Sequence, residues 1–330
     1  MKRLLTAFGF VVAASTPAFA QAVGSEVSVT GGVSSDEVTA QAMQGRIFAD
    51  TSWMRVFGEA SWANVAGPDS DAFGAAYPYE RRIEIMEAYG ERTFRNERAL
   101  AGVRAGRFRT PFGIYGGSDH GYGGFVRAPF IRYAPYWALG NTFFEHGVNV
   151  VAGVPSMQVE YTLGAPSDVG EDNARRRPGT DQVVRVQGYH GDFVVGASYI
   201  RTQPFRPRTP TSRAVFSGVD VRWMRDGFQL RGEWVDGRPN DNRHTRGGYI
   251  DAFLHRREMG PVTALARVEM LDYSGGRIPV LAKRATIGAR VLIVDGLYAT
   301  VNGSHQTGAI YSENRNSVDL GLTYTVRFAR

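Results

Sequence analysis

Arginine and acidic side chains recur at alternate positions along several segments of this sequence. Within each segment, parity predicts that one face carries Arg104, Arg185, Arg222, Arg231, Arg267, Arg290, Asp220, Glu233 and Glu269. A guanidinium group binds carboxylates and phosphates through its planar fork, so such a face attracts anions. The alternative is ordinary pairing with the 32 acidic residues of the chain, which would only keep this face polar.

A second set of candidate residues lies in one long stretch, 110–145. Asp119, His120, Arg127 and Arg132 stand there among glycines and aromatic rings. Structureless connections longer than about 15 residues are uncommon and usually functional. We expect the rings to pack against a wall and the two guanidinium groups to face an opening.

Groups for catalysis or metal binding are poorly arranged. Ser304 and His305 are adjacent, and adjacent residues of a strand point to opposite faces, whereas a Ser–His pair must meet to exchange a proton. No two of the six histidines have the spacing of metal ligands. Acids at 168–172 could hold a cation, but three arginines at 175–177 offer them a simpler partner, or could bind lipopolysaccharide phosphates. We predict no cofactor, no metal and no enzymatic activity.

The elements that position these residues alternate strictly, as β-strands with two unlike faces do. In the last segment, 317–330, every second residue from Val318 to Phe328 is apolar or aromatic, and the residues between are polar or glycine. Short connections on one side and long ones on the other are typical of an up-and-down outer-membrane barrel, whereas a soluble sandwich has no reason to sort its loops. Tight turns are predicted at 154–155, 191–192, 226–227, 259–260 and 295–296.

Extending this rhythm forward predicts eight hairpins, hence about 16 strands, although a weak break near 51–52 leaves 14 open. A ring of this size encloses water, so the oily face would meet lipid and the charged face would line a lumen. The fold class is therefore all-β, a transmembrane antiparallel barrel. The predicted front hairpins pair 24–34 with 41–50, 53–64 with 81–90, and 99–109 with 145–153.

The N-terminus predicts export. Lys2 and Arg3 precede an apolar run that ends on Ala18-Phe19-Ala20, a small-x-small cleavage pattern. The run is shorter than the roughly 20 apolar residues of a membrane-spanning helix. We expect a signal peptide at 1–20 and one mature domain at 21–330, in a compartment where the absence of cysteine means no disulfide framework.

The charge of the chain is almost entirely arginine. Its formal net charge of +6 falls to +4 once Lys2 and Arg3 are removed, and Lys283 is then the only lysine. No dense basic stretch with interleaved aromatics occurs, so nucleic acid is not an expected partner. A mean hydropathy of −0.25 fits a barrel, because only alternate residues face lipid.

Two stretches around the long connection resemble a known family. VRAGRFRTPFGIYG (103–116) and FVRAPFIRYAPYW (125–137) are similar to the segments where a strand of phosphate-selective and related substrate-specific porins ends and its long loop begins. The ending at Phe328 resembles the C-terminal signature read by the barrel-insertion machinery. The resemblance implies a Gram-negative outer membrane, a homotrimer and a third outer loop, here 110–145, folded into the lumen. It implies as partners outer-membrane lipid, lipopolysaccharide, periplasmic chaperones, the insertion machinery and small solutes.

The sequence thus predicts a porin for passive diffusion of small hydrophilic, anionic solutes. The lysine ladder of a phosphate-selective channel is absent, so phosphate itself is not predicted. Two alternatives stay open: a barrel enzyme that acts on lipids or glycans, and a structural or adhesive barrel plugged by the 110–145 loop.

Overall fold

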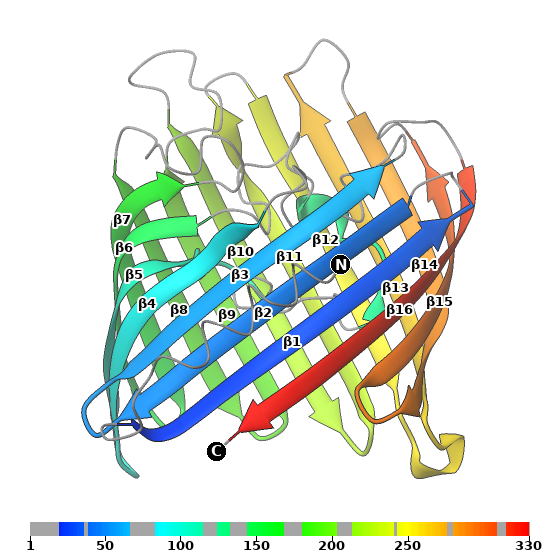
Figure 1. Cartoon of the computed structure of the whole chain (residues 1–330). Coiled ribbons are helices and arrows are strands. Elements are labelled where there is room, and N and C mark those ends of the chain that lie inside the picture. The colour runs from blue at the N-terminus through cyan, green and yellow to red at the C-terminus, as the bar shows by residue number, and fades with distance from the viewer. Residues whose placement is uncertain are drawn as a thin grey trace.

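Sixteen antiparallel strands form a closed ring in the computed structural model of the chain (Figure 1). Every strand pairs with its neighbours in sequence, and β1 closes the ring against β16. The predicted up-and-down barrel of 16 strands is therefore confirmed, and the count of 14 is excluded. The strands are β1 (Ala20–Ser34), β2 (Thr39–Thr51), β3 (Arg55–Ala66), β4 (Glu84–Arg95), β5 (Leu100–Arg109), β6 (Phe144–Val154), β7 (Met157–Ser167), β8 (Asp181–His190), β9 (Phe193–Thr202), β10 (Ala214–Arg225), β11 (Phe228–Asn240), β12 (Arg243–Leu254), β13 (Val262–Ser274), β14 (Val280–Val294), β15 (Leu297–Thr307) and β16 (Arg315–Ala329), with two short 3-10 helices, η2 (Phe130–Arg132) and η4 (Arg257–Met259).

The structure describes residues 20–35, 39–66, 83–114, 124–132, 144–167, 180–202, 213–240, 243–275, 280–308 and 315–329. The predicted signal peptide therefore lies outside the described residues up to position 19, and Ala20 is the first residue of β1. Asp119 and His120 also lie outside them, as do the charged positions 168–172 and 175–177. Within the described ranges no helix has the length and apolar character needed to cross a membrane.

The short connections lie where the sequence places them. All three front hairpins form, and the weak break near 51–52 is a connection between β2 and β3. The five predicted tight turns also form, with η4 at the one between β12 and β13. Asp226 and Gly227 both have positive φ, 49° and 77°, as the two central residues of a type I′ hairpin turn require. Such turns match the twist of the paired strands and fix their register.

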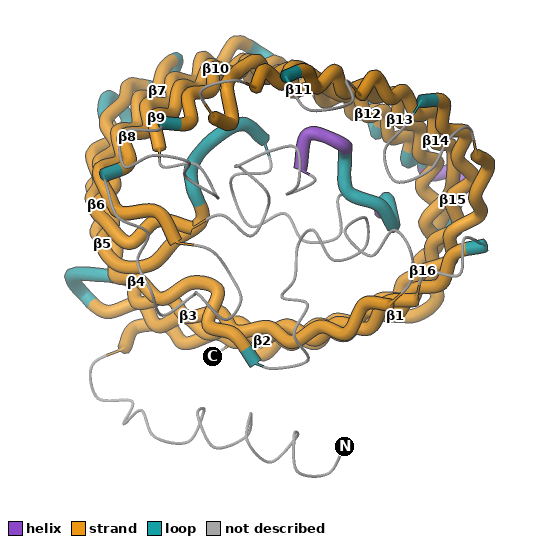
Figure 2. The backbone as a smooth tube through the Cα atoms, turned by 90° about the horizontal axis from the view of Figure 1, so that it is seen from above, coloured by secondary structure: helices purple, strands orange, loops and turns teal. Residues whose placement is uncertain are grey.

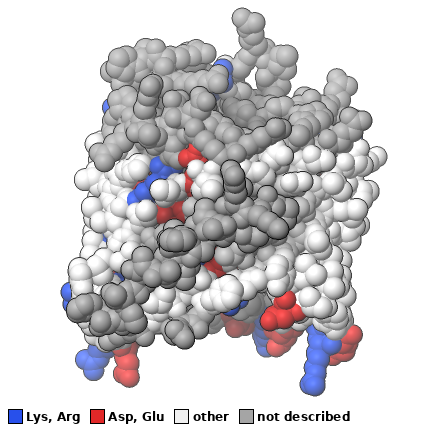
Figure 3. All heavy atoms as spheres, in the orientation of Figure 1, with Lys and Arg blue, Asp and Glu red and all other residues white. Residues whose placement is uncertain are grey.

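The two faces of each strand differ as the alternation predicts. In β16, Leu320 and Leu322 each expose about half of their side chains, 49% and 50%, whereas Asp319 between the strand's apolar positions exposes 1%. The described part of the surface over β1, β2 and β16 is mostly uncharged, and charged side chains gather at its lower edge (Figure 3). Apolar side chains thus cover the outside, and polar ones point inward.

The strands have the length that a membrane crossing needs. They contain 10 to 15 residues, whereas a tilted transmembrane strand needs about 9 to 11, and Figure 1 shows them strongly tilted. Seen along the barrel axis, η2 and the described chain next to it lie inside the ring of strands (Figure 2). The lumen wall and this inner segment together make the candidate functional site.

Candidate pore lining and the loop segments held against it

The segment 124–132 is fastened to the inner wall through its backbone. Arg267 on β13 donates from Nη1 to the carbonyl oxygen of Arg127 at 2.9 Å, and Arg284 on β14 donates from Nη2 to that of Ala128 at 2.7 Å. In return, the backbone N–H of Phe130 donates to Oε2 of Glu269 at 2.6 Å. These bonds satisfy backbone groups that would otherwise be buried without partners.

Aromatic rings of the same segment stack on wall arginines. The guanidinium carbon of Arg267 lies 4.0 Å from the ring centroid of Phe125, and that of Arg284 lies 4.3 Å from the centroid of Phe130. Both distances are well within the range of a cation–π contact. The expectation that loop rings pack against the wall therefore holds for Phe125 and Phe130.

Arg127 and Arg132 anchor this segment to three strands. Arg127 donates from Nε to Oδ2 of Asp319 on β16 at 2.9 Å and from Nη2 to the hydroxyl of Ser34 on β1 at 2.7 Å. Arg132 donates from Nη2 to Oε1 of Glu233 on β11 at 2.7 Å. Instead of facing an opening, both guanidinium groups are buried in ion pairs with the wall.

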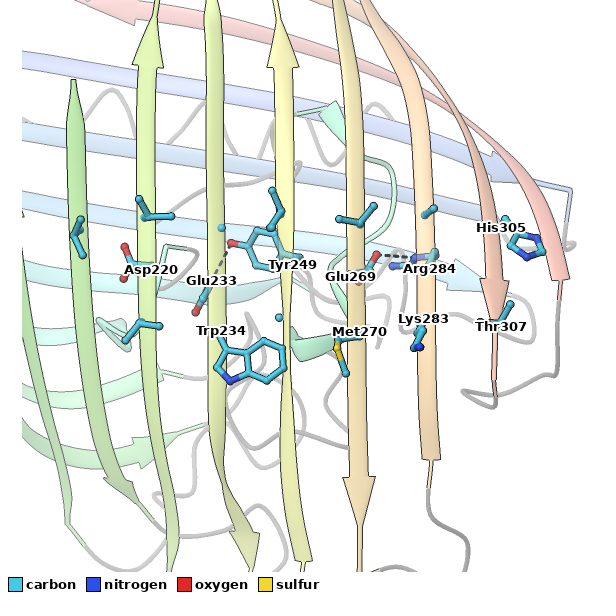
Figure 4. A pocket seen from close by; sticks show the side chains of 18 residues that line it. Asp220, Glu233, Trp234, Tyr249, Glu269, Met270, Lys283, Arg284, His305 and Thr307 are labelled. Atoms are coloured by element: carbon cyan, nitrogen blue, oxygen red, sulfur yellow. Dashed lines mark hydrogen bonds and ion pairs between the residues drawn. The ribbon is translucent and has the colours of Figure 1, made fainter.

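Glu233 holds both described parts of the long connection. Besides Arg132, its carboxylate accepts from the hydroxyl of Tyr249 at 3.1 Å and from the backbone N–H of Ile114 at 3.4 Å. The next N–H upstream, that of Gly113, donates to the hydroxyl of Ser198 at 3.2 Å. One carboxylate on β11 thus connects residues 110–114 with residues 124–132, and Figure 4 shows it turned toward Tyr249.

Most wall arginines that parity predicts to point inward do so, and they form ion pairs. Asp251 on β12 accepts from Nε of both Arg231, at 3.0 Å, and Arg267, at 2.6 Å. The other pairs are Arg104 with Glu91, Arg185 with Asp220, and Arg284 with Glu269. Because a one-to-one ion pair is nearly neutral beyond its immediate surroundings, Arg104, Arg185 and Arg284 keep the lumen polar but add little net field, whereas Arg231 and Arg267 share the one carboxylate of Asp251.

Arg222 differs from this pattern. Arg222 lies beside Arg231 in the register of β10 with β11. Its Nη2 lies 2.6 Å from the side-chain amide of Gln187, whose oxygen is assigned to this side because it can then accept from both Arg222 and Arg185, the latter at 3.2 Å. Among the described residues no carboxylate lies within ion-pair distance of Arg222. Arg290 stacks on Tyr298, with 3.9 Å between guanidinium carbon and ring centroid.

One charged cluster of the wall was missed by the parity argument. Arg109 donates from Nη2 to Oε1 of Glu59 at 2.5 Å, and its backbone N–H donates to Oε1 of Glu87 at 3.0 Å. Arg107, which has the outward parity of Val103 and Ala105, is nevertheless buried and donates to the carbonyl oxygen of Met86 at 3.0 Å. Alternation of exposure ends here because Gly106 has φ 134°, and the next four residues are all buried. Gly106 is the residue from which this end of the alternation could have been predicted.

The Ser304–His305 pair is arranged as the sequence predicts. Ser304 hydrogen-bonds to the hydroxyl of Ser317 at 2.7 Å, whereas Nδ1 of His305 lies 2.7 Å from the side-chain oxygen of Asn316. The two side chains therefore have separate partners on β16. Within the described part of the chain, no group of three His, Cys, Asp or Glu residues is placed to hold a metal ion.

Solved structures share this architecture at low sequence identity. OprB of Pseudomonas putida matches with a TM-score of 0.63 and 9% identity over 94% of each chain. OmpT of Vibrio cholerae, an outer membrane protein in its trimer form, matches with 0.61 and 11% over 93% of this chain and 100% of that one. A triple mutant of the Rh. blastica porin matches with 0.52 and 11% over 92% and 99%. No sequence-family profile and no curated protein sequence matches the chain.

These similarities show that the chain has the fold of outer-membrane porins. The finer likeness to phosphate-selective porins, read from 103–116 and 125–137, stays a prediction.

Proposed function

We propose that this protein is an outer-membrane channel through which small hydrophilic solutes diffuse passively. The observation that carries the proposal is the division of the barrel into two faces: apolar side chains are exposed on the outside, while charged and amide side chains line the inside. A soluble protein would bury the apolar face instead. The fold shared with outer-membrane porins supports the same location.

A preference for anions is the finer part of this proposal. The preference rests mainly on Arg222, whose side chain faces the lumen, is partly exposed and contacts an amide. Its neighbours in the wall, Arg185 and Arg231, add to the local positive potential even though aspartates pair with them. A fixed cation in a narrow passage with low-dielectric walls raises the local concentration of anions.

The test is electrical recording of the folded chain in planar bilayers. The proposal predicts conductance steps. In a salt gradient, it predicts a reversal potential with the sign of a channel that is more permeable to anions than to cations. The variant R222Q should move that potential toward zero, whereas R225Q, which removes an exposed arginine beside the 226–227 turn, should leave it unchanged. A folded barrel that never conducts would instead favour the structural barrel plugged by its loop.

We also propose that the channel assembles as a homotrimer, because the similar OmpT structure is a trimer form. Outer-membrane lipid, lipopolysaccharide, periplasmic chaperones and the insertion machinery are the other proposed partners. Native mass spectrometry in a mild detergent tests the stoichiometry, and a single-chain mass at every protein concentration would contradict the trimer.

A further inference from the structure

The outer face of β9 to β15 is hollowed by an apolar groove. Its volume is about 740 Å³, within the range of roughly 300–1,000 Å³ of sites that bind small molecules. Its apolar lining includes Val219, Val221, Trp234, Ile250 and Val268, which expose between 41% and 57% of their side chains. These side chains all point away from the lumen, so the groove is separate from the channel.

Two glycines form the floor of this groove. Gly232 lies opposite Ile250, and Gly248 lies opposite Trp234, in the register of β11 with β12. A Cβ added to Gly248 would come within 2.8 Å of the Trp234 ring, so the ring lies down across a position that has no side chain. The missing side chains leave a trough bordered by large apolar groups.

A cation lies at the edge of the trough nearer the long connections. Register places Trp234, Gly248, Met270, Lys283 and Thr307 in one row across β11 to β15, and Figure 4 shows the row from Trp234 to Thr307. Lys283 is exposed on the outer face, where a charge is costly near the bilayer centre and tolerated only at the interface.

The neighbouring row fixes the height of Lys283 in the membrane. One step closer to the long connections, Arg246 pairs with Asp272 at 2.9 Å on the same outer face. The apolar belt therefore ends at the row of Lys283, and Trp234 in that row has the position of an interfacial aromatic residue. An ammonium group at this level lies where lipid headgroups lie, because a long lysine side chain extends toward the polar layer.

We propose that this groove binds one membrane lipid that carries a phosphate headgroup. An acyl chain lies in the trough over Gly232, beside the Trp234 ring that covers Gly248, and the phosphate contacts the Lys283 ammonium. The proposal rests on the outer-membrane location proposed above but not on solute transport. A second copy of the chain fits less well, because it would bury Lys283 in an apolar interface, whereas a lipid phosphate supplies the opposite charge.

Native mass spectrometry of the mature barrel in a non-ionic detergent, titrated with dimyristoyl phosphatidylglycerol, tests the proposal. K283Q should weaken binding of the first lipid about fivefold, the effect of one lysine near an anionic headgroup. A285F, which fills the groove with a ring, should weaken it at least tenfold, because Ala285 lines the groove and is exposed. The matched controls are R257Q, in the exposed η4 turn, and A101F, on the outer face of β5.

The proposal is overturned if all four variants bind phosphatidylglycerol alike, or if the controls lose as much affinity as the two groove variants. It is also overturned if inorganic phosphate at equal concentration displaces the lipid, because the occupant would then be a free anion. A third contradicting result is that A285F alone dissociates the oligomer, because the groove would then be a subunit interface. Bilayer recordings of the same variants should show unaltered conductance. If lipid binding is lost while the channels conduct normally, only the lipid proposal is tested by that variant. If the chain binds lipid but does not conduct, only the proposed channel function fails.

Discussion

Neutralising Glu233 should release the inner loop segments from the wall. The substitution E233Q keeps the shape of the side chain and one acceptor oxygen, but it removes the negative charge that pairs with the Arg132 guanidinium, of which only 3% is exposed. Removing one partner of a buried ion pair costs about 3–5 kcal/mol. Because glutamine still accepts a hydrogen bond, we expect the lower end, about 3 kcal/mol, which corresponds to a change of about a hundredfold in a local opening equilibrium.

Hydrogen exchange measured by mass spectrometry reads this opening directly. The backbone N–H groups of Ile114, Val126 and Phe130 each donate to a side chain of the wall. In E233Q, we expect amides in 110–114 and 124–132 to exchange about a hundredfold faster, while the strand amides of β11 exchange as in the wild type. Open-channel current should also become noisier.

D236N is the matched control, because Asp236 lies on the same strand but pairs with His244 on the exposed outer face. R132Q should reproduce the effect of E233Q, and the double variant should be no worse than either single one, since both remove the same contact. If exchange in 110–114 and 124–132 is within twofold of the wild type in E233Q, Glu233 does not hold these segments.

Two further variants test the two faces of the wall. L322R places a charge on the lipid face of β16 and should reduce the free energy of unfolding, measured in vesicles by urea titration, by about 2–4 kcal/mol. T323R points into the lumen beside Thr30 and should reduce that free energy much less. Equal losses would contradict the assignment of faces. D251N removes the carboxylate shared by Arg231 and Arg267, so it should shift the reversal potential further to the anion side, and a shift toward cations would show that this pair does not act on the permeating ions.

Much of the fold was predictable because side chains of a membrane-spanning strand alternate with a period of two, so that one set must face lipid and the other must face the lumen. The run from Val318 to Phe328 shows this, since five of its six apolar or aromatic residues are exposed and Asp319 is buried. The turn at 226–227 was predictable for a local reason as well, because an Asp-Gly pair favours the positive φ values that a two-residue hairpin needs. Local rules repeated sixteen times therefore suffice for the barrel.

The site was predictable only in part, because ion pairing depends on which strands are neighbours. The sequence places Arg267 inward, but only the register of β12 with β13 shows that Asp251 lies opposite it. Likewise nothing local indicates that Arg127 reaches Asp319, 192 positions away. Parity also failed after Gly106, where one positive φ value ends the alternation and buries Arg109. The candidate anion-attracting face thus turned out to consist mainly of paired charges.

The measurement that tests the central claim most directly uses the absence of cysteine in this chain. Single-cysteine variants at the neighbouring positions 322 and 323 of β16 are folded into vesicles and exposed to a small, charged thiol reagent. We predict that T323C reacts rapidly from the aqueous lumen, whereas L322C is unreactive and, once labelled with a fluorophore in detergent, is quenched by brominated lipid. Equal reactivity at both positions, or the reverse order, would contradict the account of a water-filled barrel surrounded by lipid.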